Sequence, residues 1–271
     1  MDTNFVEKTI NELGLSWYYS YYWLYQYKLS KNYIIPYFQK IGFDPSGKSI
    51  CEIGSAEGGV LFAFAEYGSQ NCLATDIVQS RLDAGRVIAE AFNFPISFIS
   101  HNILTDDIPK EWEGSFDLVI LRDVIEHLEE PELALQKIKK LLKIGGYLYV
   151  TFPPYYSPFG GHQHQIQNFF SKIPYLHWIP DPIFNLFLEN GRLADVEEVV
   201  RLRSIRLTIK KFLSAVKLSG MSIKAFEFFL VRPVYKYKFG LNPVRLPKFL
   251  SFNLIREIFA TEASFILVKN T

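Results

Sequence analysis

A glycine-rich turn between a predicted strand and a predicted helix is the segment of this chain best suited to bind a ligand. The run from Glu52 to Gly59 reads Glu-Ile-Gly-Ser-Ala-Glu-Gly-Gly, and glycines there let the backbone bend tightly and approach a ligand. Asp76 ends the next predicted strand, where a carboxylate can accept both hydroxyls of a ribose. A dinucleotide-binding turn would have a glycine in place of Ala56, because the backbone there approaches a pyrophosphate. The spacing predicts a site for a nucleoside without a pyrophosphate; the alternative is a plain turn followed by a helix-capping aspartate.

Histidine side chains are the candidate proton acceptors, because imidazole titrates near neutral pH. His162 and His164 follow the fifth predicted strand, and His127 follows the fourth. We predict His162 and His127 as candidate bases, and we predict that His162 also contacts the substrate. The alternative for His162 is a loop histidine held by hydrogen bonds to the backbone. The pair His162 and His164 could bind a metal, but no acidic residue or third histidine lies nearby in the sequence, so we predict no metal site.

Alternating strands and helices between Lys48 and Pro154 position these residues. Apolar runs predict strands over 49–53, 71–76, 96–100, 116–121 and 147–152, and helices over 59–67, 80–92 and 131–142. Strands separated by helices of this length imply right-handed crossovers and a parallel sheet. Further along, the pattern predicts a helix over 203–218, strands over 222–231 and 258–269, and a loop over 232–251 between these strands. A closing pair of strands joined by a loop fits an antiparallel edge.

Two segments outside this alternation are expected to enclose a pocket. Residues 1–47 form a predicted helical N-terminal segment whose stretch 15–28 is rich in Trp and Tyr, and this aromatic helix packs on the domain or lies over a pocket. A peripheral membrane contact is a third interpretation. Residues 48–271 form the main domain, with a partly helical insertion at about 155–200 over the acceptor site. Tyr155 and Tyr156 are predicted to line the acceptor pocket together with His162.

The order of these motifs resembles the class I S-adenosylmethionine-dependent methyltransferases, particularly the type 11 and type 12 small-molecule enzymes. The resemblance runs from about Lys48 to Phe152. Glu52 to Gly58 resembles the first motif of that family, which wraps the methionine part of the cofactor, and Asp76 resembles its ribose-binding acid, with Ile77 beside the adenine.

Three later segments extend this resemblance in the family's order. Asn102 and Ile103 follow the third strand at the adenine-edge position, where many relatives carry Asp; an amide oxygen can still accept from the adenine amine. The segment 116–128, which contains Arg122, resembles the fourth-strand motif with its Glu-His pair, and 142–150 resembles the entry to strand five.

The resemblance implies a doubly wound, Rossmann-like α/β fold of seven strands, the last one antiparallel. S-adenosylmethionine would be the cofactor, bound at the carboxyl ends of the first two strands. The implied cofactor-binding residues are Glu52, Gly54, Ser55, Ala56, Gly58, Asp76, Ile77, Asn102, Ile103 and Arg122. The implied activity is in-line methyl transfer to a small-molecule acceptor; the alternatives are an RNA or protein methyltransferase and a non-catalytic binding module.

The bulk composition fits this assignment. A chain of 271 residues with 49% hydrophobic residues can bury the core of one large domain. A formal net charge of +1 gives no support for a polyanionic partner, so we expect no nucleic acid. Cys51 and Cys72 lie in apolar runs, which predicts buried thiols in a reducing cytoplasm. We find no signal-peptide pattern and no run long enough for a membrane span, and the sequence does not specify an oligomeric state.

Overall fold

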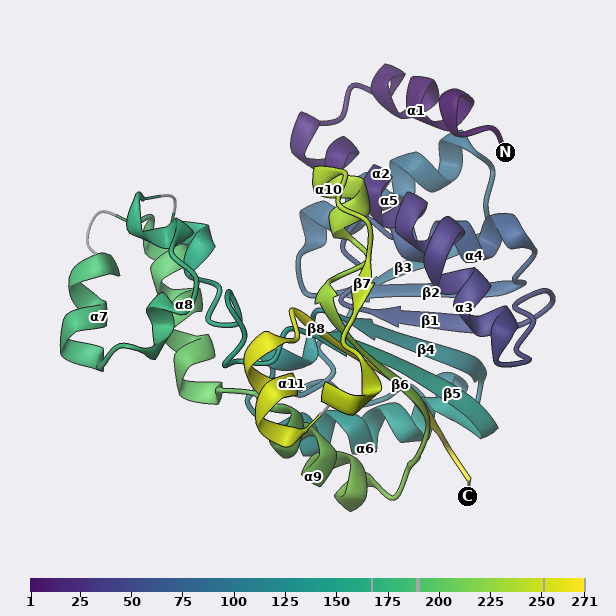
Figure 1. Ribbon diagram of the computed structural model, residues 1–271. Helices are drawn as coiled ribbons and strands as arrows, with labels where there is room; N and C mark the ends of the chain where they lie inside the picture. Colours follow the sequence, from purple (N-terminus) through teal and green to yellow (C-terminus); the bar gives the residue numbers. More distant parts are fainter. Residues whose placement is uncertain (167, 189–190, 251, 271) are drawn as a thin grey trace.

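The computed structural model of the chain describes residues 1–166, 168–188, 191–250 and 252–270. Within them, eight strands form one sheet in the order β3-β2-β1-β4-β5-β8-β6-β7 (Figure 1). The first five strands pair in parallel, whereas β8 is antiparallel to both of its neighbours. The predicted doubly wound α/β fold with an antiparallel last strand is confirmed. The strands are β1 (Ser49–Ile53), β2 (Asn71–Asp76), β3 (Ile96–Ser100), β4 (Phe116–Arg122), β5 (Leu142–Phe152), β6 (Ser222–Val231), β7 (Val244–Arg245) and β8 (Glu262–Val268).

The segment between β6 and β8 differs from the prediction. Where a loop was expected, the chain forms the short helix α10 (Tyr235–Phe239) and the two-residue strand β7, which pairs antiparallel with β6 and gives the sheet an eighth strand. The helix α11 (Asn253–Phe259) replaces the expected start of the last strand, which begins at Glu262. Both residues of β7 are exposed, so the alternation of buried and exposed residues that identifies a strand in a sequence is missing there.

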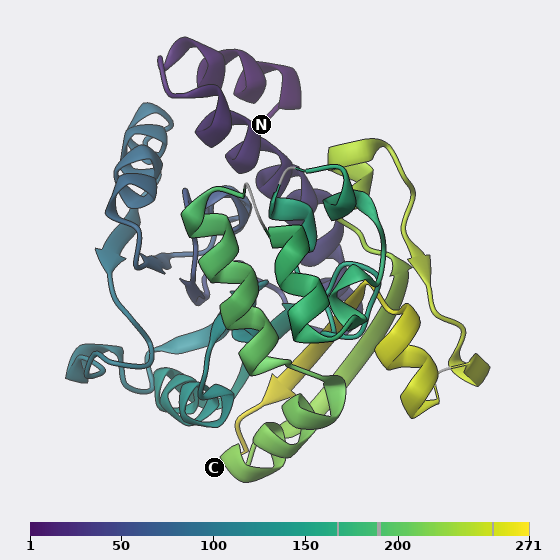
Figure 2. The ribbon, with the colours of Figure 1, turned by 90° about the vertical axis from the view of Figure 1, so that its left-hand side faces the viewer.

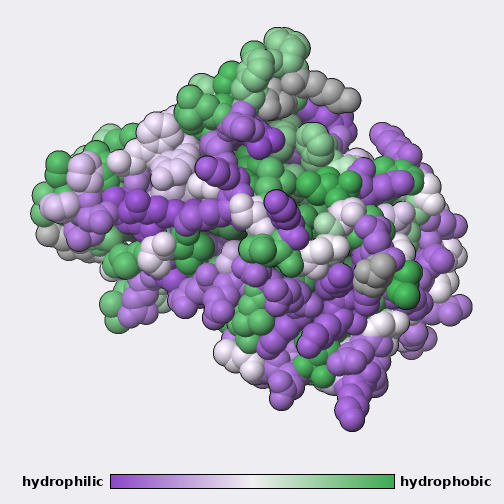
Figure 3. Space-filling view, turned by 90° about the horizontal axis from the view of Figure 1, so that it is seen from below, coloured by the Kyte–Doolittle hydropathy of each residue, from purple (hydrophilic) through white to green (hydrophobic). Residues whose placement is uncertain are grey.

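Helices cover both faces of the sheet, because successive strand residues point to opposite sides. Leu118 and Ile120 of β4 face a core made with α2, α3, α4 and α5, whereas Val119 and Leu121 face a second core made with α6 and α9. The helices are α1 (Thr3–Glu12), α2 (Trp17–Leu29), α3 (Ile35–Lys40, after a π-helical turn at Ser30–Ile34), α4 (Gly59–Tyr67), α5 (Gln79–Ala91), α6 (Pro131–Leu141) and α9 (Ile209–Ser219). Seen from below, hydrophilic side chains cover much of the surface over α6 and α9 (Figure 3).

The predicted helix over 203–218 is wrong. The chain forms two helices instead, α8 (Leu193–Ile205) and α9, separated at Arg206, whose φ of 46° lies in the left-handed region. A left-handed residue cannot continue a right-handed helix, so the chain changes direction there. Thr208 then starts α9, since its side chain accepts a hydrogen bond from the Lys211 amide at 3.0 Å.

The insertion after β5 lies beyond the carboxyl ends of the parallel strands. It contains α7 (Asp181–Leu188), α8 and three short 3₁₀ turns, and it has a small core of its own around Phe184. In Figure 1 it lies on the left, where the parallel strands end, and in Figure 2 its helices lie in front of the sheet. The insertion is partly helical, as predicted, but its last helix continues to Ile205. None of the described helices has the length and apolarity that a membrane crossing needs.

Candidate active site

The turn after β1 has the tight geometry that its glycines predict. Gly54 has a φ of +67°, and a Cβ at that position would collide with Val124, so only glycine fits there. Ala56 follows in the left-handed region with a φ of 53°. The Ser55 amide donates to the Thr75 carbonyl oxygen at 2.9 Å, which ties the turn to the end of β2. These contacts hold the backbone of the turn beside Asp76.

Asp76 accepts hydrogen bonds from the backbone on both sides. Its Oδ2 accepts from the Ala56 amide at 2.8 Å and its Oδ1 from the Val78 amide at 2.9 Å. Each carboxylate oxygen retains a further lone pair, which leaves capacity for a ribose hydroxyl. Beside it, Ile77 is 67% exposed and offers an apolar surface for a base.

A cavity of about 590 Å³ lies over this turn. Of the predicted cofactor-binding residues, it is lined by Glu52, Gly54, Ser55, Ala56, Asp76, Ile77 and Arg122. Arg122 is buried, and its Nη1 makes no hydrogen bond within the described residues although it lies 3.3 Å from the Asp123 carboxylate. A cavity of this size, a carboxylate for a ribose and a guanidinium with donor capacity for a carboxylate fit S-adenosylmethionine.

Three predicted cofactor residues are not brought to the cavity lining. Gly58 starts α4, and a Cβ there would contact Phe98. Asn102 uses its side-chain oxygen to accept the Leu104 amide at 3.0 Å, which stabilises its own loop. Ile103 is buried in the core on the α6 side of the sheet. Asn102 and Ile103 thus lie outside the lining of this cavity, and their contact with adenine stays a prediction.

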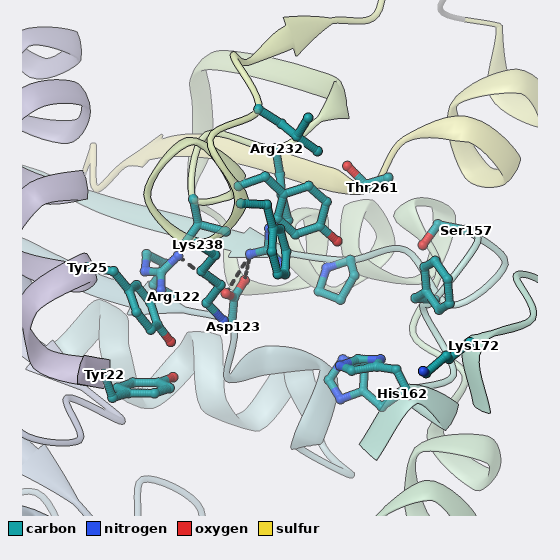
Figure 4. A pocket seen from close by; sticks show the side chains of 17 residues that line it. Tyr22, Tyr25, Arg122, Asp123, Ser157, His162, Lys172, Arg232, Lys238 and Thr261 are labelled. Carbon is teal, nitrogen blue, oxygen red and sulfur yellow. Dashed lines mark hydrogen bonds and ion pairs between the residues drawn. The ribbon is translucent and has the colours of Figure 1, made fainter. Parts of the chain in front are cut away.

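A second cavity, of about 520 Å³, adjoins the first. The two cavities share the lining residues Tyr22, Arg122, Asp123, His162, His164, Arg232 and Lys238. The walls of the second cavity come from α2, the segment after β5 and α10, and they carry the aromatic side chains Tyr22, Tyr25, Phe159, Tyr235 and Phe239 (Figure 4). The N-terminal aromatic helix and the segment after β5 thus both contribute side chains to the lining of this cavity.

An ion cluster links three strand ends at the border between the two cavities. Arg232, just after β6, donates to both carboxylate oxygens of Asp123, after β4, at 2.6 and 2.5 Å, and to Glu262 in β8 at 2.9 Å. Burial raises the pKa of Asp123, but the charges of Arg232 and Arg122 outweigh burial and hold this pKa well below its usual value. The cluster was not predicted, since its members are far apart in the sequence: Arg232 lies 109 positions from Asp123 and 30 from Glu262.

The two predicted catalytic histidines face each other, with ring centroids 5.2 Å apart. His127 Nδ1 forms a short contact with the carboxylate of Glu198 in α8. Burial lowers the pKa of His127, but this hydrogen bond and the charge of Glu126 outweigh burial and raise it. Burial and the neighbouring His127 and His164 lower the pKa of His162 well below its usual value, so His162 is neutral near pH 7.

Glu126 completes the histidine cluster. It is 3% exposed, neither of its carboxylate oxygens has a hydrogen-bond partner within the described residues, and burial raises its pKa to about 7. Donor atoms of Glu126, His127 and His162 lie within 4.8 Å of one another. These donor types suit proton transfer and also a divalent cation. Sequence reasoning placed Glu126 only within a motif and missed Glu198, which the insertion brings back 71 positions later.

Tyr155 and Tyr156 do not line the cavity that contains His162, contrary to the prediction. They line a separate pocket of about 570 Å³ together with His177, Trp178 and others. The Tyr155 amide donates to the Leu207 carbonyl oxygen at 2.8 Å, and its own carbonyl oxygen accepts from His177 at 2.6 Å. These bonds tie the segment after β5 to the junction of α8 and α9 and account for the position of both rings.

Comparisons with known proteins agree with this geometry. Residues 44–184 match a family model described as a methyltransferase domain. A ubiquinone biosynthesis O-methyltransferase of Chromobacterium violaceum is 24% identical over 106 residues, which cover 39% of this chain and 44% of that protein. A PKS-NRPS hybrid synthetase of Chaetomium globosum is 30% identical over 103 residues, 36% of this chain and 2% of that protein. The chain thus aligns with less than half the length of these curated relatives.

Solved structures share the fold at low sequence identity. The S-adenosylmethionine-dependent methyltransferase of Mesorhizobium loti aligns with a TM-score of 0.54 and 16% identity, covering 86% of this chain and 96% of that one. Magnesium protoporphyrin IX methyltransferase of Synechocystis PCC 6803, solved with bound SAH, aligns with a TM-score of 0.52 and 13% identity, covering 90% and 83%. Because the family model spans more than half of the chain and the nucleoside turn has the expected geometry, this protein belongs to the class I S-adenosylmethionine-dependent methyltransferase family.

Proposed function

We propose that this protein transfers a methyl group from S-adenosylmethionine to a small-molecule acceptor in the second cavity. The observation that carries the proposal is the aromatic-lined cavity of about 520 Å³ that adjoins the nucleoside site. Its volume is typical of sites for small organic molecules. The names of similar proteins, a ubiquinone biosynthesis O-methyltransferase and a magnesium protoporphyrin IX methyltransferase, also point to small-molecule acceptors.

The residues of the first cavity would hold the cofactor, which supplies an electrophilic methyl group on a sulfonium. Asp76 would accept the ribose hydroxyls, and the turn at Gly54 to Ala56 would bring the backbone close to the methionine part. Arg122 has donor capacity for the methionine carboxylate. Holding the two reactants in line can lower the barrier by about 7–11 kcal/mol.

The histidine cluster would manage the proton of the acceptor. His162 is neutral near pH 7, so a ring nitrogen can accept a proton from an acceptor hydroxyl or ammonium group. His127, whose pKa is raised, lies within ring contact of His162 and is oriented by Glu198. We propose His162 as the base, and His127 as the second candidate that receives or stabilises the charge.

We also propose a cytoplasmic location and no nucleic-acid partner. Cys51 and Cys72 are buried free thiols, which suits a reducing compartment. The formal net charge of +1 provides no field for a polyanion.

The test is an assay with methyl-labelled S-adenosylmethionine in three parallel incubations. The first contains a panel of hydroxylated aromatic small molecules, the second total RNA and the third a protein extract. We expect label in the small-molecule products only. Label in RNA or protein would replace the proposed acceptor class, and cofactor binding without transfer to any of the three would indicate a binding module.

A further inference from the structure

One half-buried lysine of the acceptor cavity has no acidic partner among the described residues. Lys238, in α10, places its ammonium 4.4 Å from the ring centroid of Tyr25 and 5.9 Å from that of Tyr22. Among the described residues, no carboxylate forms an ion pair with it. Burial lowers its pKa to about 8, and Arg232 and Arg122 lower it in the same direction, while Asp123 acts weakly against them. A partly desolvated cation without an anion is unfavourable, so this half-buried side chain has unused capacity for a negative group.

The other charges of the cavity do not compensate Lys238. The lining contains four basic side chains, Arg122, Lys172, Arg232 and Lys238, and one acidic side chain, Asp123. Arg232 is already paired with Asp123 and Glu262, whereas Arg122 lies 3.3 Å from Asp123 and keeps its Nη1 free for the methionine carboxylate proposed above. His164 faces Lys238 but is neutral near pH 7, because burial and then the charges of Lys238 and Arg232 lower its pKa to about 4. The two lysines therefore leave the cavity with an excess of positive charge (Figure 4).

We propose that the acceptor is an organic acid, whose carboxylate or phosphate pairs with Lys238 while its apolar body lies against the aromatic walls. The inference rests on the proposed function and names the substrate class of the same cavity. Val234 and Phe239 from the α10 segment and Phe159 from the insertion supply the apolar surface around the lysine. A charge-assisted hydrogen bond in such an apolar surround is stronger than one in water. Lys172, exposed on a 3₁₀ turn (Phe170–Lys172), adds attraction for an anion.

The methionine carboxylate of the cofactor has the same chemistry as the proposed acid group. Lys238 lines both cavities, so it lies within reach of either carboxylate, whereas Lys172 lines only the acceptor cavity. An experiment must therefore separate the two sources of the anion.

The test uses the full chain saturated with S-adenosylhomocysteine and four probes in two matched pairs, measured by calorimetry. Benzoate is compared with benzamide, and phenyl phosphate with phenol. We expect at least one anionic probe to bind about tenfold tighter than its neutral partner near neutral pH. Lys238→Met should abolish this preference, Lys238→Arg should retain it, and Lys172→Met should weaken it less. Since the pKa of Lys238 is about 8, its ammonium loses a proton as the pH rises through that value, and the preference for anionic probes should fall with it.

Three results would overturn the inference. One is equal binding of the anionic and neutral members of both pairs, and another is the absence of any anionic binding at about 20 mM probe. The third concerns the Lys238→Met variant, which would keep the preference for anionic probes but bind S-adenosylhomocysteine more weakly. If this variant bound methylthioadenosine, which lacks the carboxylate, as tightly as the wild type does, the lysine would bind the cofactor and not the acceptor. Failure of the wild-type chain to bind S-adenosylhomocysteine would instead contradict the proposed function, so the two failures are distinguishable.

Discussion

The carboxylate of Asp76 stabilises the turn after β1 and faces the proposed ribose position at the same time. We expect Asp76→Ala to weaken S-adenosylmethionine binding at least about tenfold, or 1.4 kcal/mol, because the ribose loses its acceptor. Calorimetry measures the affinity and circular dichroism checks that the variant is folded. Asp83→Ala, on the exposed side of α5, is the matched control. Unchanged affinity in the Asp76 variant would show that the ribose assignment is wrong.

Replacing His162 tests the proposed base. We expect His162→Ala to lower turnover by about 10²-fold or more and to change the cofactor affinity much less, because the ring accepts a proton from the acceptor at the border of the two cavities. Steady-state kinetics and calorimetry measure the two quantities. His164→Ala is the control, since this ring lies in the same loop but has no ring contact with His127. Normal turnover of the His162 variant with the acceptor would remove it as base.

Glu198 should set the protonation of His127. Since the hydrogen bond that His127 donates to the Glu198 carboxylate raises the pKa of His127 above 6.5, we expect Glu198→Gln to lower this pKa, which an NMR titration of the ring protons measures. A raised histidine pKa stabilises the fold below pH 6.5, and this stabilisation is lost as the pH rises through the folded-state pKa. Because the pKa of Glu198 is lowered to about 2, the contribution of the pair is also lost as the pH falls through that value. The exposed Glu197→Gln variant should behave as wild type, and an unshifted His127 titration in the Glu198 variant would contradict the pairing.

The order of the motifs along the chain was sufficient to predict that part of the site lies at one edge of the sheet. Gly54 and Asp76 end neighbouring parallel strands, and the carboxyl ends of such strands meet at one edge of the sheet. His127 and His162 follow later strands of the same sheet and reach the same edge. Glu198 and Lys238 could not be predicted, because an insertion and the segment between two antiparallel strands carry them, and no periodic pattern fixes where such segments fold back.

At the scale of elements, the contact between α2 and α4 depends on Gly59. A Cβ at this helical position would collide with the Trp23 carbonyl oxygen and the Gln26 side chain. We expect Gly59→Ala to lower the free energy of unfolding by about 1–3 kcal/mol through this overpacking, measured by urea denaturation. Alanine alone would stabilise a helix by about 1 kcal/mol relative to glycine, so a stabilised variant would disprove the close contact. Ser214→Ala on the exposed face of α9 is the control and should change stability by less than about 0.5 kcal/mol.

The elements that repeat strand, turn and helix were predicted within a few residues, because apolar periodicity and glycine turns mark them directly. The break between α8 and α9 was missed since Arg206 adopts a left-handed conformation without a glycine or proline as a signal. The hydroxyl of Thr208 ahead of an apolar run was the available sign of a new helix start. Local chemistry therefore identified regular elements better than the irregular connections that enclose the acceptor cavity.

At the scale of the whole molecule, Arg232 connects the ends of β4, β6 and β8. We expect Arg232→Met to lower the free energy of unfolding by about 3–5 kcal/mol, because it removes the cation that pairs with the buried carboxylate of Glu262 and with the partly exposed carboxylate of Asp123. Arg245→Met is the control. The Arg245 side chain is 57% exposed, so its ion pair with Glu227 should contribute less than about 1 kcal/mol to the free energy of unfolding. Urea denaturation measures the free energy of unfolding of both variants. Equal losses in the Arg232 and Arg245 variants would contradict the stabilising role of the ion cluster. The lowered pKa of Asp123 means that its stabilisation is present above pH 3.8 and is lost as the pH falls further.

The position of β8 has a consequence for how the chain assembles. This strand comes last in the order of the strands, yet it lies between β5 and β6 and hydrogen-bonds to both. On a ribosome, β6 therefore leaves the tunnel before β8, through which it joins the parallel part of the sheet in the described chain, has been synthesised. The wall that carries Arg232 and Lys238 can be secured only after β8 emerges, so the nucleoside turn is built early in synthesis and the proposed acceptor chamber is closed late.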